Sequence, residues 1–469
     1  MLSYVSDERV VHTVGTMPTL SGEAMNHNHL AGAAEWHEAP ISHSISAKHR
    51  RVIVAATIGN TLEWYDFLIY GLLAITIAKL FFPAGSELSS LLLSMATFGI
   101  GLVMRPVGAI VLGIYADRVG RRAALSWAIV IMALGTGLIA VAPTYETIGI
   151  FAPLLIALAR MLQGFSCGGE MGGAIAFLAE NAPQRRRGLY ASWQAASQSA
   201  GFLLAAIVTM VMMLLMTPAQ IESGGWRWPF VVGLLIAPVG FYIRSKLDEP
   251  ELFLKARDEA RPAAVADILQ REGQPALTAL GVSVLYLVSA YVLLVYMPTF
   301  ALRQLQLPFS GALQATAVAS CLVVVCAPIA GAISDRIGRK PMLQLATLGY
   351  LLLTYPAFAM LSAWPSIALL TVVQSGFAVL MSIYCGPLVS VLAELFPTRM
   401  RSTGVALAYN LVAVVGGFAA RHHHLVDCGD RESASSRLLC DRRGRDQWRR
   451  PFLAAGSAWR AASAMNQRW

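Results

Sequence analysis

Charged residues are scarce in this chain. Only 13% of its 469 residues are Asp, Glu, Lys or Arg, whereas 56% are hydrophobic, and a typical soluble domain is about 25% charged. This composition argues against a soluble globular protein. Because a backbone in lipid must satisfy its hydrogen bonds internally, and because the apolar runs are long and unalternated, the sequence predicts an all-α integral membrane protein.

Paired cysteines, phosphate-binding motifs and catalytic clusters are missing too. Four of the six cysteines lie inside apolar runs without paired spacing, which indicates packing residues. The Gly-x-x-x-x-Gly-Lys-Ser/Thr pattern of a phosphate loop does not occur, nor does a grouped nucleophile and base or a metal-ligand spacing. We therefore expect no metal, no cofactor, no ATP site and no enzyme activity.

Against this background, two motifs occur twice. The charged loop from Gly113 to Arg122 returns from Gly331 to Lys340, a shift of 218 residues, and the segment that starts at Glu180 returns at Glu394, a shift of 214 residues. Motifs repeated between long apolar stretches predict a duplicated membrane bundle. The repeated loop residues are Gly113, Asp117, Arg118, Gly120, Arg121 and Arg122, then Gly331, Asp335, Arg336, Gly338, Arg339 and Lys340; the second echo pairs Glu180 and Arg185 with Glu394 and Arg399.

Apolar segments of roughly 20 residues or more predict membrane helices. They lie near 52–80, 90–115, 123–142, 148–179, 188–216 and 228–245, then near 276–301, 311–333, 341–362 and 366–395, with a last one that starts at Ser402. The predicted organisation is an extension over 1–47, a first bundle over 48–246, a charged connector over 247–275, a second bundle over 276–420 and a tail over 421–469.

Basic residues concentrate in alternate loops. Both repeated loops, the connector and the region before the first helix are rich in Lys and Arg, whereas the other loops hold only Lys79, Arg227 and Arg303. Since Lys and Arg favour the cytoplasmic side, we expect the N-terminus, the connector and both repeated loops in the cytoplasm. The extension is polar and without periodicity, so we expect it to be disordered.

Several segments carry a resemblance to a known family. The paired loops resemble the signature of the major facilitator superfamily, and the segments around Glu63, Arg105, Arg160 and Glu394 resemble its metabolite:proton symporter subfamily, over about residues 48–419. The resemblance implies two six-helix halves around a central cavity and proton-coupled symport by alternating access. The implied substrate is a small organic acid or a betaine-like zwitterion, and the implied setting is a bacterial inner membrane, with a monomeric carrier and no nucleic-acid partner.

Two carboxylates in the first helix are candidates for proton coupling or substrate contact. Glu63 and Asp66 are three residues apart and share one helix face, where an ionised carboxylate costs about 2.5–3.5 kcal/mol on insertion scales. A carboxyl group that binds and releases a proton as the cavity opens to each side would offset that cost. The alternative is a static ion pair or an interfacial position that only orients this helix.

Two arginines and several polar residues complete the candidates. Arg105 lies twelve residues before Asp117, about 18 Å along its helix, and Arg160 is similarly deep, so each needs an anionic substrate or a carboxylate such as Glu63, Asp66 or Glu170. The remaining substrate or proton-coupling candidates are Gln163, Glu170, Gln194 and Gln198, the last two on one helix face, with Tyr286, Tyr291 and Tyr296 as weaker ones. Glycines at four-residue spacing around Glu170 indicate a close helix-packing face.

The repeated loops predict a gate. We expect Asp117 to face the N-terminal end of a helix in the opposite half, whose partial positive charge favours a carboxylate, while Arg118 and Arg121 hold the loop. The function implied by all these residues is secondary active symport. The alternative from another class is a non-transporting remnant or a membrane sensor that retains the bundle.

The tail departs from the pattern. Residues 421–469 contain ten Arg, no Lys and no apolar run long enough to span, so the second half is truncated, with about 11 spans instead of the 12 that the family implies. A basic tail could bind an anionic partner, and three consecutive His could bind metal or mark a tag. We favour a third interpretation, a frameshift just after Phe418, because the codons allowed for 422–430 encode an apolar helix one base downstream. In that case the chain as written should fold or transport poorly.

Overall fold

The computed structural model describes residues 47–413, except residue 85 and residues 246–247, 251–252 and 255–272. The expected N-terminal extension, apart from Ala47, the Arg-rich tail and most of the connector lie outside the described residues. The described part contains helices and no strand, which confirms the all-α fold class.

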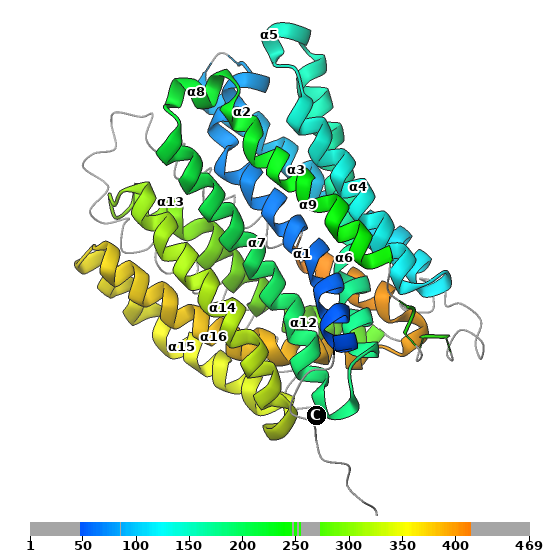
Figure 1. Cartoon of the computed structure of the whole chain (residues 1–469). Coiled ribbons are helices and arrows are strands. Elements are labelled where there is room, and N and C mark those ends of the chain that lie inside the picture. The colour runs from blue at the N-terminus through cyan, green and yellow to red at the C-terminus, as the bar shows by residue number, and fades with distance from the viewer. Residues whose placement is uncertain (1–46, 85, 246–247, 251–252, 255–272, 414–469) are drawn as a thin grey trace, which may run out of the picture. The chain divides into compact units, whose positions relative to one another are not determined.

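The first half of the chain forms six long helical segments with short helices between them (Figure 1). Its elements are α1 (Ala47–Leu72), α2 (Ala74–Phe81), α3 (Glu87–Arg118), α4 (Arg121–Val141), α5 (Tyr145–Ile148), α6 (Phe151–Glu180), η1 (Gln184–Arg186), α7 (Arg187–Leu215), α8 (Pro218–Ser223), η2 (Gly225–Arg227) and α9 (Trp228–Ser245).

The second half repeats the pattern as far as it is described. Its elements are α12 (Gly273–Ala290), the π-helix η3 (Tyr291–Tyr296), α13 (Met297–Arg303), α14 (Phe309–Ile337), α15 (Arg339–Ala363), α16 (Ile367–Leu395) and η4 (Thr398–Met400), followed by helical residues 401–413. Over the described residues, eight helical stretches are long and apolar enough to cross a membrane, and α1 with α2 makes a ninth if that bent pair is one span.

Two predicted helices are less regular than expected. The segment predicted over 52–80 divides at Leu73, where α1 and α2 meet at a 66° bend. Gly71 stands just before the break, and glycine weakens a helix because it adds backbone freedom without side-chain contacts. The segment predicted over 276–301 contains the π-helix η3, a wide turn that often marks functional sites.

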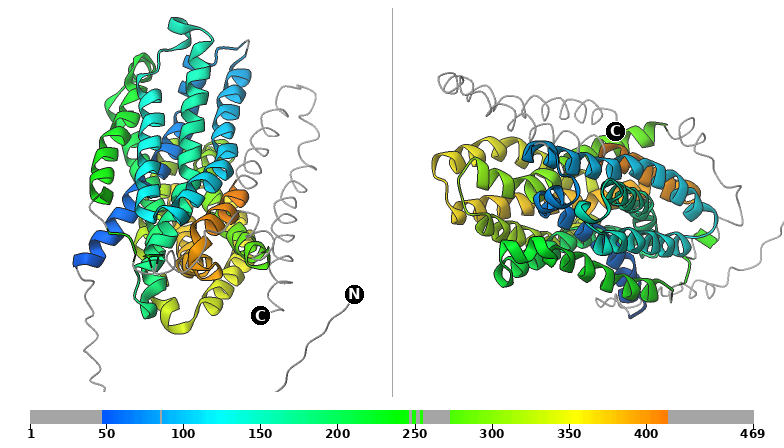
Figure 2. Two further views of the ribbon diagram at one scale, coloured as in Figure 1. Left: turned by 90° about the vertical axis from the view of Figure 1, so that its right-hand side faces the viewer. Right: turned by 90° about the horizontal axis from the view of Figure 1, so that it is seen from above.

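The two halves meet along α7. Within the first half α6 packs against α3 and α4, and within the second α16 packs against α14 and α15, while α7 contacts both α14 and α16. In the view from above in Figure 2, α4 (cyan) and α15 (yellow) lie on opposite sides. Leu345, Leu348 and Leu352 of α15 are each more than half exposed, as expected for a lipid-facing helix.

The predicted glycine face is confirmed. A Cβ atom on Gly164 would lie 1.9 Å from the Gly101 carbonyl oxygen of α3, and one on Gly168 would lie 2.0 Å from the Arg105 carbonyl oxygen. On the same helix, a Cβ on Gly172 would lie 2.2 Å from the carbonyl oxygen of Ser402 in the second half. The absence of side chains therefore lets α6 approach both neighbours closely.

Candidate functional site

Among the described residues, the charged residues that are buried as a whole belong to the first half. They are Glu63 and Asp66 of α1, Arg105 of α3, Arg121 of α4, and Arg160, Glu170 and Glu180 of α6. The buried polar side chains described in the second half are Ser, Thr, Gln and Asn. The charge chemistry of the interior is therefore concentrated in one half of a duplicated fold.

Glu63 and Arg105 form the first interior cluster. An Arg105 Nη atom lies 3.9 Å from Glu63 Oε1, and the Cys167 thiol donates a hydrogen bond to the same oxygen. The Arg105 guanidinium also stacks over Trp64 and Phe67, 5.2 and 5.1 Å from the ring centroids. Aromatic faces attract a cation and help to hold it away from water.

Asp66 and Arg160 belong to a second cluster, a chain of polar contacts. The Thr136 hydroxyl donates to Asp66 Oδ2, Gln163 Nε2 donates to Thr136 Oγ1 at 3.0 Å, and Arg160 Nη1 donates to Gln163 Oε1 at 2.7 Å. Arg160 also lies 4.5 Å from the Tyr70 ring centroid. Thr136 and Gln163 therefore lie between Asp66 and Arg160 in this chain of contacts. Arg160 has no ion pair within the described part of the chain.

Both clusters line one small cavity in the first half. Two buried polar atoms of its walls, Asp66 Oδ1 and Arg160 Nε, have no hydrogen-bond partner among the described residues. Since a buried polar atom left unsatisfied costs about 1–3 kcal/mol, this cavity offers an acceptor and a donor to a small polar ligand or to water. Their roles in coupling or substrate contact stay predictions.

Glu170 lines a second small cavity. Glu63 and Met132 line both cavities. Ser166 also borders the second cavity and donates a hydrogen bond to the Ala128 carbonyl at 2.6 Å. The second cavity is therefore adjacent to the first, and residues of α1, α4 and α6 line it.

The two glutamines of α7 separate, although they were expected to line the cavity together. Gln194 lies against α1, where the Asn60 side chain donates to the backbone carbonyl of Gln194 at 2.9 Å. Gln198 Oε1 accepts a 2.7 Å hydrogen bond from the Tyr286 hydroxyl of α12. Neither lines the two cavities. Their side chains diverge because α7 is packed between the two halves.

Tyrosines of the second half surround the first-half clusters. Tyr291 packs against Phe67 with 6.4 Å between ring centroids, and Tyr286 packs against Tyr409 at the same separation. Tyr296 instead packs against Phe300. Tyr409 was missed in the sequence because it belongs to none of the motifs.

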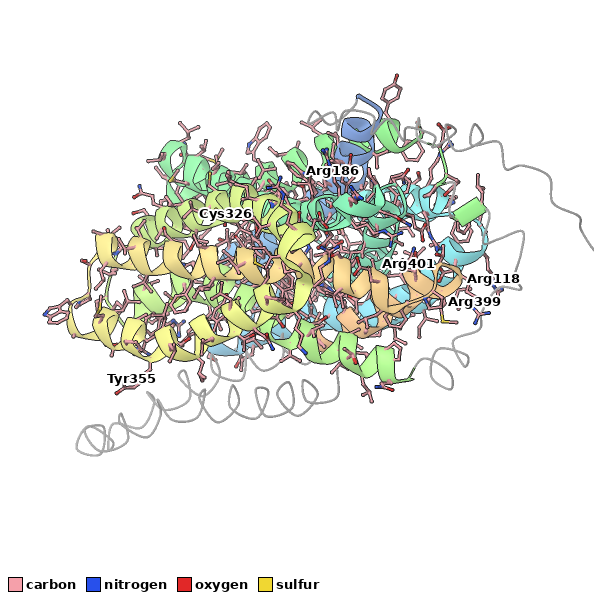
Figure 3. All side chains as sticks on the ribbon, turned by 90° about the horizontal axis from the view of Figure 1, so that it is seen from below. Arg118, Arg186, Cys326, Tyr355, Arg399 and Arg401 are labelled. Carbon is pink, nitrogen blue, oxygen red and sulfur yellow. The ribbon has the colours of Figure 1, made fainter. Side chains whose placement is uncertain are left out.

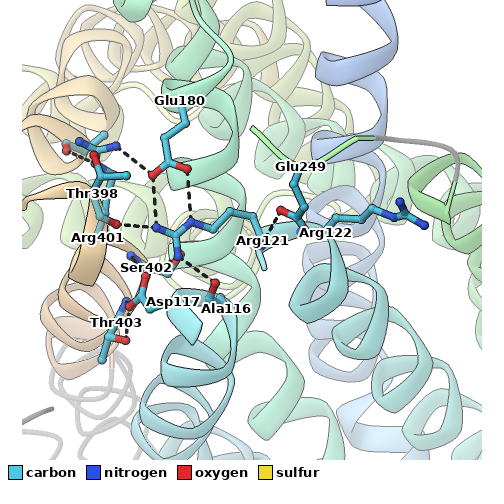
Figure 4. A network of polar contacts seen from close by, with 11 residues as sticks. Ala116, Asp117, Arg121, Arg122, Glu180, Glu249, Thr398, Arg401, Ser402 and Thr403 are labelled. Carbon is cyan, nitrogen blue, oxygen red and sulfur yellow. Dashed lines mark hydrogen bonds and ion pairs between the residues drawn. The ribbon is translucent and has the colours of Figure 1, made fainter. Parts of the chain in front are cut away.

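The first repeated loop binds the opposite half (Figure 4). The Asp117 carboxylate accepts hydrogen bonds from the backbone N–H groups of Ser402 and Thr403 at 3.3 and 3.0 Å, and from the Thr403 hydroxyl. These groups open the helix over 401–413, so the carboxylate faces a helix N-terminus. Gly113 allows this approach, because a Cβ there would lie 2.9 Å from Thr403 Cα.

Arg121 holds the same loop from inside. Its guanidinium bonds Asp117, contacts both Glu180 oxygens at 3.3 Å and donates to the Thr398 carbonyl at 2.6 Å. Arg401 of the second half donates to Glu180 Oε1 at 2.9 Å. Glu180 is therefore shared by two arginines, one from each half.

Residues at the start of the connector also contact this loop. Glu249 accepts from the backbone N–H groups of Arg121 and Arg122 at 2.9 and 3.1 Å, and the Phe253 ring lies 4.7 Å from the Arg121 guanidinium. Glu249 therefore caps α4, which begins after Gly120 at a φ of 148°. The signal in the sequence that could have identified Glu249 is its negative charge. The partial positive charge at the N-terminal end of a helix, here α4, attracts an acidic side chain.

The second repeated loop makes the mirror contact with fewer partners. Asp335 accepts from the backbone N–H groups of Gly188 and Leu189 at the start of α7, at 2.8 and 2.9 Å. Arg339 pairs with Asp335 at 2.7 Å and with Glu394 at 3.1 Å, and the side chains of Arg339 and Glu394 are partly exposed. Gly331 packs against Gly188, and Gly338, at a φ of 104°, precedes α15.

Four predicted gate arginines do not hold the loops. Arg118, Arg185, Arg336 and Arg399 are exposed, and Figure 3 places Arg118 and Arg399 toward the same side of the view as Arg401. The expectation that Arg118 ties the loop is wrong, because this side chain points to the surface and has no ion pair with any described residue. Arg121 and Arg401 make these contacts instead.

Comparisons with known proteins agree with this architecture. The family model described as Major Facilitator Superfamily matches residues 56–420. The chain is 39% identical over 383 residues to the citrate-proton symporter of Klebsiella pneumoniae, covering 81% of this chain and 86% of that protein. It is 34% identical over 382 residues to the proline/betaine transporter of Escherichia coli (strain K12), covering 79% of this chain and 76% of that protein.

The solved structures that match are similar in fold. A structure of the proton:xylose symporter XylE bound to 6-bromo-6-deoxy-D-glucose superposes with a TM-score of 0.71 at 17% identity, covering 82% of this chain and 90% of that one. At that identity the likeness concerns the fold alone.

Proposed function

Because the chain belongs to the major facilitator superfamily, we propose that it is a secondary active transporter that carries a small organic acid or zwitterion together with a proton. The observation that carries this proposal is the first-half cavity, where buried Asp66 and Arg160 each have a polar atom without a partner. The alternative of a non-transporting remnant or sensor is not favoured, because the relatives reported above are named as carriers.

Carboxylate chemistry supports the substrate class. Citrate, proline and betaine differ in charge, but each bears at least one carboxylate. A guanidinium recognises a carboxylate through parallel N–H donors, and Arg160 is a buried guanidinium without an ion pair among the described residues. We assign Arg160 to the substrate carboxylate and Asp66 to the coupled proton.

Alternating access requires that the loop contacts break and re-form. The contacts of Asp117 and Asp335 join the halves at one end of the bundle. The distribution of Lys and Arg supports a cytoplasmic position for this end, so the structure corresponds to a carrier closed toward the cytoplasm. We further propose a monomer in the bacterial inner membrane that needs no cofactor besides its coupling ion.

Transport in proteoliposomes tests the proposal. The purified full chain is screened with mono-, di- and tricarboxylates, shikimate and betaines, while the external pH is recorded. A symporter takes up substrate and makes the medium more alkaline. Arg160→Gln should lose uptake and Asp66→Asn should lose the pH change, whereas Lys79→Gln, at a site 49% exposed, should retain both. Substrate binding without flux would instead support the non-transporting alternative.

A further inference from the structure

The distribution of buried charge separates the two halves by role. Away from the repeated loops, the buried acids and bases of the described chain lie in the first half, and the second half lines the interior with tyrosines and neutral polar groups. A buried carboxyl group can carry a proton, whereas Ser, Thr, Gln and Asn side chains keep their protons at physiological pH. In the described chain, the buried carboxyl groups that could carry a proton through the interior therefore lie in the first half, whereas Asp335 and Glu394 of the second half lie at the loop end.

Two cavities connect the buried carboxyl groups of that half. Asp66 and Glu63 line the first cavity, and Glu63 and Glu170 line the second. Met132 lines both cavities. Asp66 Oδ1 is buried in the first cavity without a partner. Each cavity has room for about one water molecule.

These groups form successive levels along α6. Gln163, Cys167 and Glu170 follow one another at spacings of four and three residues, so they lie on one face. Gln163 contacts Asp66 through Thr136, so these two residues lie at a similar height along the bundle. Cys167 donates to Glu63, so these two also lie at a similar height. Glu170 is one turn further toward Glu180 and the repeated loops, about 10 Å from the level of Gln163.

We propose that Glu170 is a proton-carrying residue that receives the coupled proton from Glu63 and passes it toward the end of the bundle closed by the repeated loops. The inference rests on the symport proposed above and adds a residue and a route to it. The route runs inside the first half, from the cavity that Glu63 shares with Asp66 and Arg160 to the cavity that it shares with Glu170.

The transfer balances through one water molecule. The O–H bond of protonated Glu63 breaks and its proton moves to a water in the second cavity, while a proton of that water moves to the Glu170 carboxylate. Glu63 is left negative, and the Arg105 guanidinium at 3.9 Å offsets that charge. Glu170 then releases the proton when the loop contacts open and water reaches its cavity.

The surroundings of Glu170 suit this role. Its cavity is bordered on α4 by the apolar side chains of Ala128, Ile129 and Met132, so a proton entering from α1 meets no competing acceptor there. Glu63 of α1 is the other titratable residue among the described residues that line this cavity.

The experiment separates substrate exchange from proton-driven accumulation. Exchange moves substrate both ways without net proton transfer, so it does not need a proton exit, whereas accumulation against a gradient does. Wild type, Glu170→Gln and Glu146→Gln, which alters an exposed carboxylate, are reconstituted as full chains. We expect Glu170→Gln to retain exchange and to lose both accumulation driven by a pH gradient and substrate-dependent alkalinisation, and Glu146→Gln to retain all three.

Each outcome decides the proposal. If Glu170→Gln accumulates substrate and moves protons like wild type, the proposal is wrong. If it loses exchange as well, Glu170→Asp decides, because a proton carrier predicts a shifted pH profile of uptake, and an unchanged profile overturns the role. Failure of the wild type to couple substrate to protons would refute symport itself, a result visible before any variant is compared.

Discussion

The Asp117 carboxylate of the first half accepts a 3.0 Å hydrogen bond from the backbone N–H of Thr403 in the second half. Asp335 makes the reciprocal contact with Leu189 at 2.9 Å. The duplicated sequence thus forms two contacts between the halves, here called locks, in which an Asp carboxylate accepts from the first backbone N–H groups of a helix. We expect the Asp117 lock to stabilise the closed end more than the Asp335 lock does. Around Asp117 the partners Arg121 and Glu180 are buried, whereas around Asp335 the partners Arg339 and Glu394 are partly exposed.

Asp117→Asn should open the loop end of the bundle more than Asp335→Asn does. Hydrogen bonds to a charged group contribute roughly 1.5–3 kcal/mol, and solvent weakens the more exposed lock. We expect faster alkylation of Cys167, whose cavity becomes accessible on opening, in a background where the other five of the six cysteines are serine. Equal alkylation rates in the two variants would contradict the unequal locks.

Glu180→Gln should destabilise the folded protein far more than Glu394→Gln. Removing the Glu180 charge breaks its buried ion pair with Arg121 and its ion pair with Arg401, and leaves Arg121 with Asp117 alone; breaking a buried pair costs about 3–5 kcal/mol. Glu394 is 38% exposed in its pair with Arg339, where such a pair contributes about 0–1 kcal/mol. Thermal unfolding in detergent measures both, and a similar melting temperature for the two variants would count against the network.

Gly164→Ala should be destabilising, and Gly376→Ala should not. A Cβ on Gly164 would lie 1.9 Å from the Gly101 carbonyl oxygen, whereas one on Gly376 has no atom within 4 Å. Overpacking of this kind costs about 1–3 kcal/mol, and alanine is the better helix former at the open site. Unfolding in denaturant compares the pair directly, and a tolerated Gly164→Ala would show that α3 and α6 can separate.

The nucleotide sequence tests the interpretation of the tail. A frameshift after Phe418 predicts that the frame one base downstream encodes about 40 mostly apolar residues, enough to complete the eleventh span and add a twelfth. A chain with that translation in place of 419–469 should transport faster than the chain as written. A polar shifted frame would refute the interpretation and leave the Arg-rich tail as a genuine feature.

Sequence patterns predicted the helices and the family well, because both depend on local composition. Long apolar runs define spans wherever they fold, and the loop around Asp117 is a short motif with its own chemistry. The break at Leu73 was not predicted, because the hydropathy of this segment is continuous across it. The outward positions of Arg118 and Arg399 were also missed, since residues adjacent in a motif point in different directions on a helix.

The sequence by itself determined that this protein is a duplicated all-helical membrane bundle. It also identified two repeated loops whose charged residues were expected to bind the opposite half. Only the tertiary structure decided which charges meet: that Gln163 and Thr136 stand between Arg160 and Asp66, that Arg401 shares Glu180, and that Glu170 adjoins the cavity of Glu63. The physical reason is that hydropathy acts along the chain and can be read locally, whereas ion pairs and cavities depend on helix rotation and packing between segments hundreds of residues apart.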